Sequence, residues 1–171
     1  MRVRLILATA LSSVPAVAFA HPGGPGALGF TEGFLHPLTG LDHLTAAVIV
    51  GLLAALARPA GAVLGAFLGA LAAGLFMGAA FPPIASAAEI GILLTFAALA
   101  GAFILRKTRA WIVPLGAGVT GLAHGLAHGA DGAGAAAFAA GVLAATAALV
   151  LAGCLVGHWL RRLRHGGSAR A

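Results

Sequence analysis

Two histidines and an aspartate lie within the octapeptide His36-Pro37-Leu38-Thr39-Gly40-Leu41-Asp42-His43, at the beginning of a long apolar run. An ionisable side chain inside a membrane-spanning helix costs at least about 2.5–3.5 kcal/mol at mid-bilayer, so by default it indicates a functional site. Imidazole and carboxylate groups together form a ligand set that suits divalent transition metals. These three side chains, His36, Asp42 and His43, are therefore the first candidates for a metal site.

A second group of the same residue types lies near the other end of the chain. His124 and His128 are four residues apart, which places them one turn apart on the same face of a helix. This is the simplest way for one helix to offer two nitrogens to one ion, and Asp131 could add an oxygen from the same face. The simpler interpretation is that both histidines hydrogen-bond between helices. The neighbouring acid favours a metal site.

Three further residues could contribute ligands, and each has a simpler interpretation. We expect Glu89 at the outer start of a helix, where a carboxylate also complements the helix dipole. Glu32 is either an outer ligand or a solvated loop residue. His21 would become the N-terminal residue after removal of a leader, and it could then chelate through its amine and imidazole or lie in a disordered terminus. We leave His158 and His165, next to the basic tail, outside the site.

The spacing of His36 and His43 limits how they could bind an ion. On a regular helix, seven residues place them on one face but roughly 10 Å apart along the axis, too far for one ion. Either the helix is irregular around Pro37 and Gly40, or the two histidines bind at successive positions along a path. We favour the second alternative, with His36 at the entrance. Pro37 suits the first position of a helix, which would place His36 at its mouth.

The composition is that of an integral membrane protein. Of the 171 residues 61% are hydrophobic and only 8% are charged, and the mean hydropathy is +1.05; a soluble domain has about 25% charged residues. The single cysteine, Cys154, excludes a disulfide within the chain and a cysteine-based metal site. Small residues favour close helix packing, and two glycine series with a spacing of four predict packing faces: Gly61, Gly65 and Gly69, and Gly121, Gly125 and Gly129.

Residues 1–20 read as a cleavable signal peptide, with Arg2 and Arg4 before an apolar core and Ala18-Phe19-Ala20 as the cleavage pattern. The alternative is an uncleaved first helix. We expect residues 21–171 to form one all-α transmembrane domain, a compact Gly/Ala-rich bundle of five helices, or six if the leader is retained. The expected helices cover about residues 33–57, 61–80, 87–105, 110–128 and 133–160, followed by a basic tail at 161–171.

The basic residues predict the orientation in the membrane. Arg58, the loop 106–109 and the tail 161–171 fall on alternate connections, whereas 81–88 and 129–132 contain no Lys or Arg. The positive-inside rule then makes the basic side cytoplasmic, so that the C-terminus lies in the cytoplasm and the mature N-terminus lies outside. All four acids would lie towards the outer side, where they attract cations. The net charge of +6 thus reflects topology and not nucleic-acid binding.

These motifs resemble those of the HupE/UreJ family, small bacterial permeases for nickel and related metals. His36-Pro37-x-x-Gly40-x-Asp42-His43 matches the family's motif in its first mature helix. His124-Gly125-x-Ala127-His128-Gly129-Ala130-Asp131 is similar to its second histidine motif, which usually ends in Glu, so Asp131 is a shorter acid of the same charge. Glu89, after Pro82-Pro83, resembles the acid that begins the family's third helix. The resemblance extends over nearly the whole chain.

The resemblance implies energy-independent or gradient-driven passage of Ni²⁺, or of Co²⁺ or another divalent ion, from periplasm to cytoplasm. We therefore expect a secondary transporter and not an enzyme, with lipid and a divalent metal as partners and no tightly bound cofactor. Zn²⁺, Cu²⁺ and Fe²⁺ also suit these ligands. The alternatives are a metal sensor or accessory protein, or a membrane-embedded metalloenzyme. The sequence has no nucleotide-binding loop, and a bundle of this size is compatible with a homo-oligomer.

Overall fold

The computed structural model describes residues 29–57, 60–105, 110–131 and 135–167. Regular structure in these ranges consists of six α-helices and no strand, which confirms the expected all-α class. The helices are α2 (Phe30–Thr39), α3 (Leu41–Leu56), α4 (Ala60–Ala80), α5 (Pro82–Leu105), α6 (Ile112–Asp131) and α7 (Ala136–Gly167). The expected signal peptide and His21 lie outside the described residues.

Two of these helices are long and apolar enough to cross a membrane, namely α4 and the part of α7 from Ala136 to Leu163. The pair of α2 and α3 meets the same criteria when taken together, although it is bent by 80°. Among the described residues there are thus two or three candidate spans, which supports a membrane protein. The count of five spans stays a prediction.

The prediction of one helix over residues 33–57 is wrong, because the helix is broken at Gly40. The backbone of Gly40 is extended (φ −85°, ψ 112°), and it separates the end of α2 from the start of α3. The hydroxyl of Thr39 lies 3.2 and 3.1 Å from the carbonyl oxygens of Leu35 and His36, so it can satisfy acceptors at this helix end. Pro37 lies inside α2 and not at its first position, so His36 belongs to the last turn.

The remaining helices differ from the expected ranges mainly at their ends. α4 begins one residue before the expected start, whereas α5 begins five residues early, at Pro82. A proline favours the first position of a helix because its missing N–H has no partner there in any case. α7 continues to Gly167, so most of the expected basic tail is helical.

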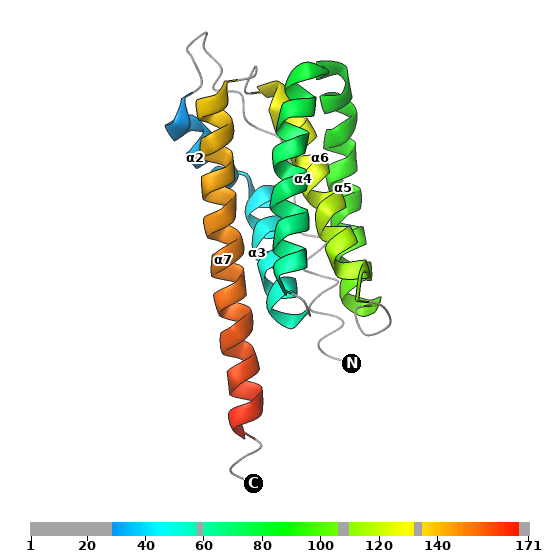
Figure 1. The fold of residues 1–171 in the computed structure, drawn as a ribbon, viewed down its shortest axis with the longest axis vertical. Coiled ribbons are helices and arrows are strands. Elements are labelled where there is room, and N and C mark those ends of the chain that lie inside the picture. The colour runs from blue at the N-terminus through cyan, green and yellow to red at the C-terminus, as the bar shows by residue number, and fades with distance from the viewer. Residues whose placement is uncertain (1–28, 58–59, 106–109, 132–134, 168–171) are drawn as a thin grey trace.

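The helices form two groups that meet along α3 and α4 (Figure 1). In the first group α3 packs along α7, and α2 packs near the beginning of α7. In the second group α6 packs against both α4 and α5. A buried cluster that includes Val50, Phe67, Leu99 and Val150 joins the two groups.

Glycines allow α4 and α6 to touch backbone to backbone. A methyl group on any of three α6 glycines would overlap a backbone carbonyl oxygen of α4: Gly121 meets Phe67, Gly125 meets Leu71 and Gly129 meets Leu75. This predicted packing face is therefore present. The other predicted face is not used within the described residues, since nothing lies within 4 Å of a Cβ built at Gly61, Gly65 or Gly69.

Candidate metal centre

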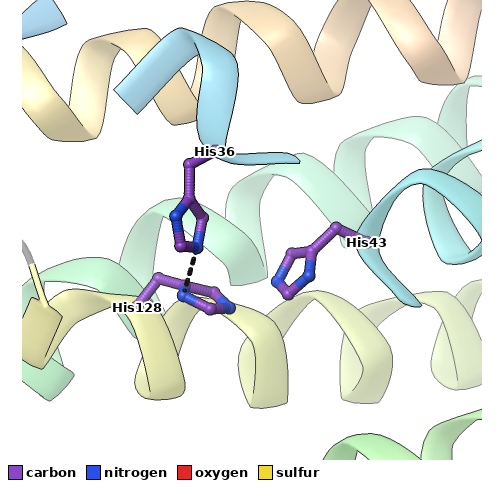
Figure 2. Close-up of side chains that lie close together, drawn as sticks. All are labelled: His36, His43 and His128. Carbon is purple, nitrogen blue, oxygen red and sulfur yellow. Dashed lines mark hydrogen bonds between the residues drawn. The ribbon is translucent and has the colours of Figure 1, made fainter. Parts of the chain in front are cut away.

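Four imidazoles from three helices gather at one place. His36 lies in the last turn of α2, His43 in the first turn of α3, and His124 and His128 on α6. Their ring centroids are 4.4 Å apart for His36 and His128, 4.2 Å for His43 and His128, and 4.7 Å for His43 and His124. Figure 2 shows the rings of His36, His43 and His128 pointing toward one another.

The break at Gly40 overturns the expectation that His36 and His43 bind at separate positions. That expectation assumed a regular helix, but the 80° bend brings their ring centroids to 5.7 Å. One ligand atom from each of His36, His43 and His128 lies within 4.8 Å of the other two. Three ligand atoms at about 2.0–2.1 Å from one ion are about 3.3–3.6 Å apart, so the rings would have to approach one another by up to about 1.5 Å for all three to bind together.

A second set of ligands overlaps the first. One ligand atom from each of Asp42, His43 and His124 also lies within 4.8 Å of the others, so His43 belongs to both sets. His124 and His128 are one turn apart, about 6 Å along α6. The two sets therefore follow one another along α6, with His43 in common.

Three of the imidazoles are held in the same manner, each with Nδ1 close to an oxygen atom. The contacts are His43 to Asp42 Oδ1 at 3.0 Å, His124 to the Thr120 carbonyl oxygen at 2.8 Å, and His128 to Asp131 Oδ2 at 2.9 Å. A carbonyl or ionised carboxylate oxygen can only accept a hydrogen bond, so Nδ1 donates in each case. In the neutral ring the other nitrogen, Nε2, then carries a lone pair.

No group in the described part of the chain forms a hydrogen bond with these lone pairs. The Nε2 atoms of His43, His124 and His128 are buried and have no hydrogen-bond partner there. The residues themselves are only 9%, 2% and 9% exposed. Leaving a buried polar atom unpaired costs about 1–3 kcal/mol. A buried imidazole with an oriented ring and an unused nitrogen is what a metal ion requires of a histidine ligand.

His36 differs from the other three because it is only partly buried. Its Nε2 atom lies 2.8 Å from Nδ1 of His128, and its ring meets the Phe138 ring edge-on with centroids 5.8 Å apart. His36 is thus the member of the cluster that is partly exposed at the protein surface and also contacts a buried imidazole.

The family described as HupE / UreJ protein matches residues 9–171, a range that includes both histidine motifs and every described helix. This chain belongs to the HupE/UreJ family. The family is associated with nickel and cobalt transport and is a transporter family, not an enzyme family. No curated protein and no solved structure matches the chain.

The remaining predicted site residues of this HupE/UreJ family member, Asp131, Glu32 and Glu89, each lie in a different place in the structure. Asp131 is the last residue of α6 and contacts the His128 imidazole, but it belongs to neither ligand set. Glu32 is exposed and accepts a hydrogen bond from the Gly29 N–H at 3.0 Å, so it caps α2. Glu89 is the eighth residue of α5 and not at its start; its side chain lies outside the described residues.

Two residues that support the cluster were missed from the sequence. The Thr120 carbonyl orients His124 from one turn below, a relation that the four-residue spacing could have suggested. Phe138 packs against His36 from α7, and no local signal points to that contact because the two residues lie on different helices.

Proposed function

We propose that this protein is a secondary transporter that carries a divalent transition-metal ion across a bacterial inner membrane, with Ni²⁺ as the first candidate. The main support is the set of three buried, unpaired Nε2 atoms on His43, His124 and His128. Imidazole and carboxylate ligands without a thiolate suit Ni²⁺ and also Co²⁺, Zn²⁺, Cu²⁺ and Fe²⁺. The family's association with nickel and cobalt favours the first two.

The two overlapping ligand sets support a stepwise path. The ion binds first to His36, His43 and His128, and then to Asp42, His43 and His124. Because His43 belongs to both sets, the ion can move by about one helical turn while it keeps one ligand. Passage requires binding that is favourable but shared among several weak sites, so that the ion can leave.

The carboxylates have two roles in this mechanism. Asp131 orients His128 and does not bind the ion itself. Asp42 orients His43 while the ion is in the first set, and in the second set it supplies an oxygen ligand. Hydrogen-bond partners of this kind fix the tautomer of a ligating imidazole and increase its basicity.

We place the histidine cluster on the periplasmic side. His36 of the cluster contacts Phe138 in the first turn of α7, whereas Arg161 and Arg162 lie near the other end of this helix, whose course Figure 1 shows. The positive-inside rule makes the arginine end cytoplasmic. Five spans after a cleaved leader are part of this proposal, and uptake then runs from periplasm to cytoplasm.

The proposal is tested by metal accumulation in cells that express variants at equal levels. His36→Ala, His43→Ala and Asp42→Asn should all reduce uptake, and His43→Ala should reduce it most because both ligand sets lose a member. Glu32→Gln is the matched control, since Glu32 is exposed and lies outside both sets. Unchanged uptake in the three site variants would exclude this mechanism.

Purified protein in liposomes distinguishes transport from binding alone. A transporter should fill the vesicles with Ni²⁺ in the presence of a metal gradient, and His43→Ala should abolish the flux. Tight binding without flux would instead identify a sensor or accessory protein, and turnover of a substrate without flux would identify a metalloenzyme.

A further inference from the structure

One face of α7 changes from apolar to cationic near the C-terminal end of the helix. Leu151, Leu155 and Trp159 are 57%, 71% and 59% exposed, and His158 and Arg162 are also exposed. Their spacings of three and four residues place them along one side of the helix. Leu155, His158, Trp159 and Arg162 together line a shallow surface hollow. We refer to these five residues as the α7 stripe.

The length of α7 places the change in polarity at the edge of a membrane. At 1.5 Å per residue, Trp159 lies about 35 Å along the helix from Ala136, and the hydrocarbon core of a bilayer is about 30 Å thick. Leu151 and Leu155 therefore lie at the depth of the acyl chains, and Arg162 lies at the depth of the headgroups. Tryptophan is enriched at this boundary.

Arg162 is available for a ligand, whereas its neighbour is not. The Arg161 guanidinium donates a hydrogen bond to the Ala55 carbonyl oxygen at 2.6 Å and so ties α7 to the end of α3. Arg162 is exposed and has no partner among the described residues. The sequence after Asp131 contains no Asp or Glu that could neutralise the charge.

We propose that the α7 stripe binds one anionic phospholipid. Its phosphate lies between His158 and Arg162, and an acyl chain lies along Leu155 and Leu151. The positive charge favours an anionic headgroup over a zwitterionic one, and the adjoining apolar surface favours a lipid over a free anion. A second copy of the chain would bring another cationic helix end to the same place and would be repelled.

The experiment uses Trp159 as the reporter. The chain has two tryptophans, so Trp111→Phe leaves Trp159 alone. The full protein is reconstituted in phosphatidylcholine vesicles. A minor fraction of the lipid carries brominated acyl chains, and this fraction is either phosphatidylglycerol or phosphatidylcholine. Brominated chains quench the fluorescence of a tryptophan that they contact. Brominated phosphatidylglycerol should quench Trp159 more strongly than the same fraction of brominated phosphatidylcholine.

Variants in the Trp111→Phe background then identify the basic residue that selects the anionic lipid. Arg162→Gln should lower the apparent affinity for phosphatidylglycerol about fivefold, the effect of one basic side chain at an anionic surface. Arg162→Lys should retain most of the selectivity, which also shows that the site tolerates substitution. Arg170→Gln removes the same charge outside the stripe and should have little effect. In the reciprocal variant, Trp159→Phe, the reporter Trp111 follows the basic segment 106–109, and any lipid preference it shows should be unaffected by Arg162→Gln.

Four results would overturn the proposal. Equal quenching by both lipids would show that the stripe does not select charge, and an equal effect of Arg170→Gln would indicate diffuse surface charge. Competition by inorganic phosphate as effective as that by lipid would indicate a free-anion site. Cross-linking of two chains at this face, with Trp159 shielded from both lipids, would indicate a protein interface. None of these readouts depends on metal transport.

Discussion

The chemistry of the histidine cluster depends on which nitrogen of each ring is already hydrogen-bonded. Most buried polar atoms in proteins are satisfied, and a purely structural histidine would use both of its ring nitrogens. His124 uses only Nδ1, which donates to its own helix, and its buried Nε2 has no partner among the described residues. Hydrogen bonding between helices accounts for the contact of His128 with His36, but it leaves three buried Nε2 atoms without a role.

At Asp131, two substitutions distinguish an orienting residue from a metal ligand. Asp131→Ala should lower the Ni²⁺ affinity about tenfold or more, the usual effect of losing the partner of a ligating imidazole. Asp131→Asn should cost less, because its amide oxygen can still accept the hydrogen bond from His128 Nδ1. Equilibrium dialysis of the purified variants measures both. If Asn weakens binding as much as Ala does, the carboxylate itself is a ligand.

Protons should compete with the metal ion at the imidazoles. An imidazole gains a second proton as the pH falls, and the imidazolium has no lone pair for a metal. Ni²⁺ affinity and uptake should therefore fall steadily as the pH is lowered. Equilibrium dialysis over a pH series tests the direction, with Glu32→Gln expected to follow the same curve. A pH-independent affinity would argue against imidazole ligands.

At the scale of the helices, the contact between α4 and α6 positions two of the four imidazoles. Gly125 lies between His124 and His128, and a methyl group on it would meet the backbone of Leu71 and Gly74. Gly125→Ala should therefore push the helices apart, lower stability by about 1–3 kcal/mol, and weaken metal binding. Thermal unfolding and Ni²⁺ titration of the purified variant provide the two measurements.

Gly65→Ala is the matched control for Gly125→Ala. Gly65 is also a helical glycine, but nothing lies within 4 Å of a Cβ at that position. The substitution should leave metal binding unchanged and raise helix stability slightly, since alanine is the better helix former. Equal destabilisation by both substitutions would contradict the close packing of α6 on α4.

The helices could be predicted from the sequence more completely than the site. Long apolar runs indicated the positions of α4 to α7, because only helices satisfy their own backbone in lipid. Pro37 and Gly40 indicated that the helix could be irregular there, but neither residue determines the direction or size of the bend. Without the bend, His36 and His43 were expected about 10 Å apart. The contact of Asp131 with His128 Nδ1 could not be predicted either, because spacing places a carboxylate on a face but does not identify the atom it contacts.

At the scale of the whole molecule, the ligands come from both helix groups. His36 and His43 lie on α2 and α3, which pack with α7, whereas His124 and His128 lie on α6, which packs with α4 and α5. Contacts between the groups are fewer than those within them. A bound ion would therefore link the two helix groups through its ligands.

This link predicts a metal-dependent gain in stability that requires both groups. An ion that binds only the folded protein stabilises it by about 2.7 kcal/mol at one hundred times its Kd, so Ni²⁺ should raise the Tm of the purified protein. Mg²⁺, which prefers oxygen ligands, should not. His43→Ala should remove most of the shift, because His43 is the ligand common to both sets.

Hydrogen exchange shows whether the ion truly bridges the two groups. If it does, Ni²⁺ should slow amide exchange both around the break between α2 and α3 and in the last turns of α6, and His43→Ala should abolish the protection in α2 and α3. Binding to α6 alone through His124 and His128 would protect only α6 and would leave the effect intact in His43→Ala. Protection confined to α6 would therefore refute the bridge even if the Tm still rose, because stabilisation by a ligand requires only that the folded state bind it.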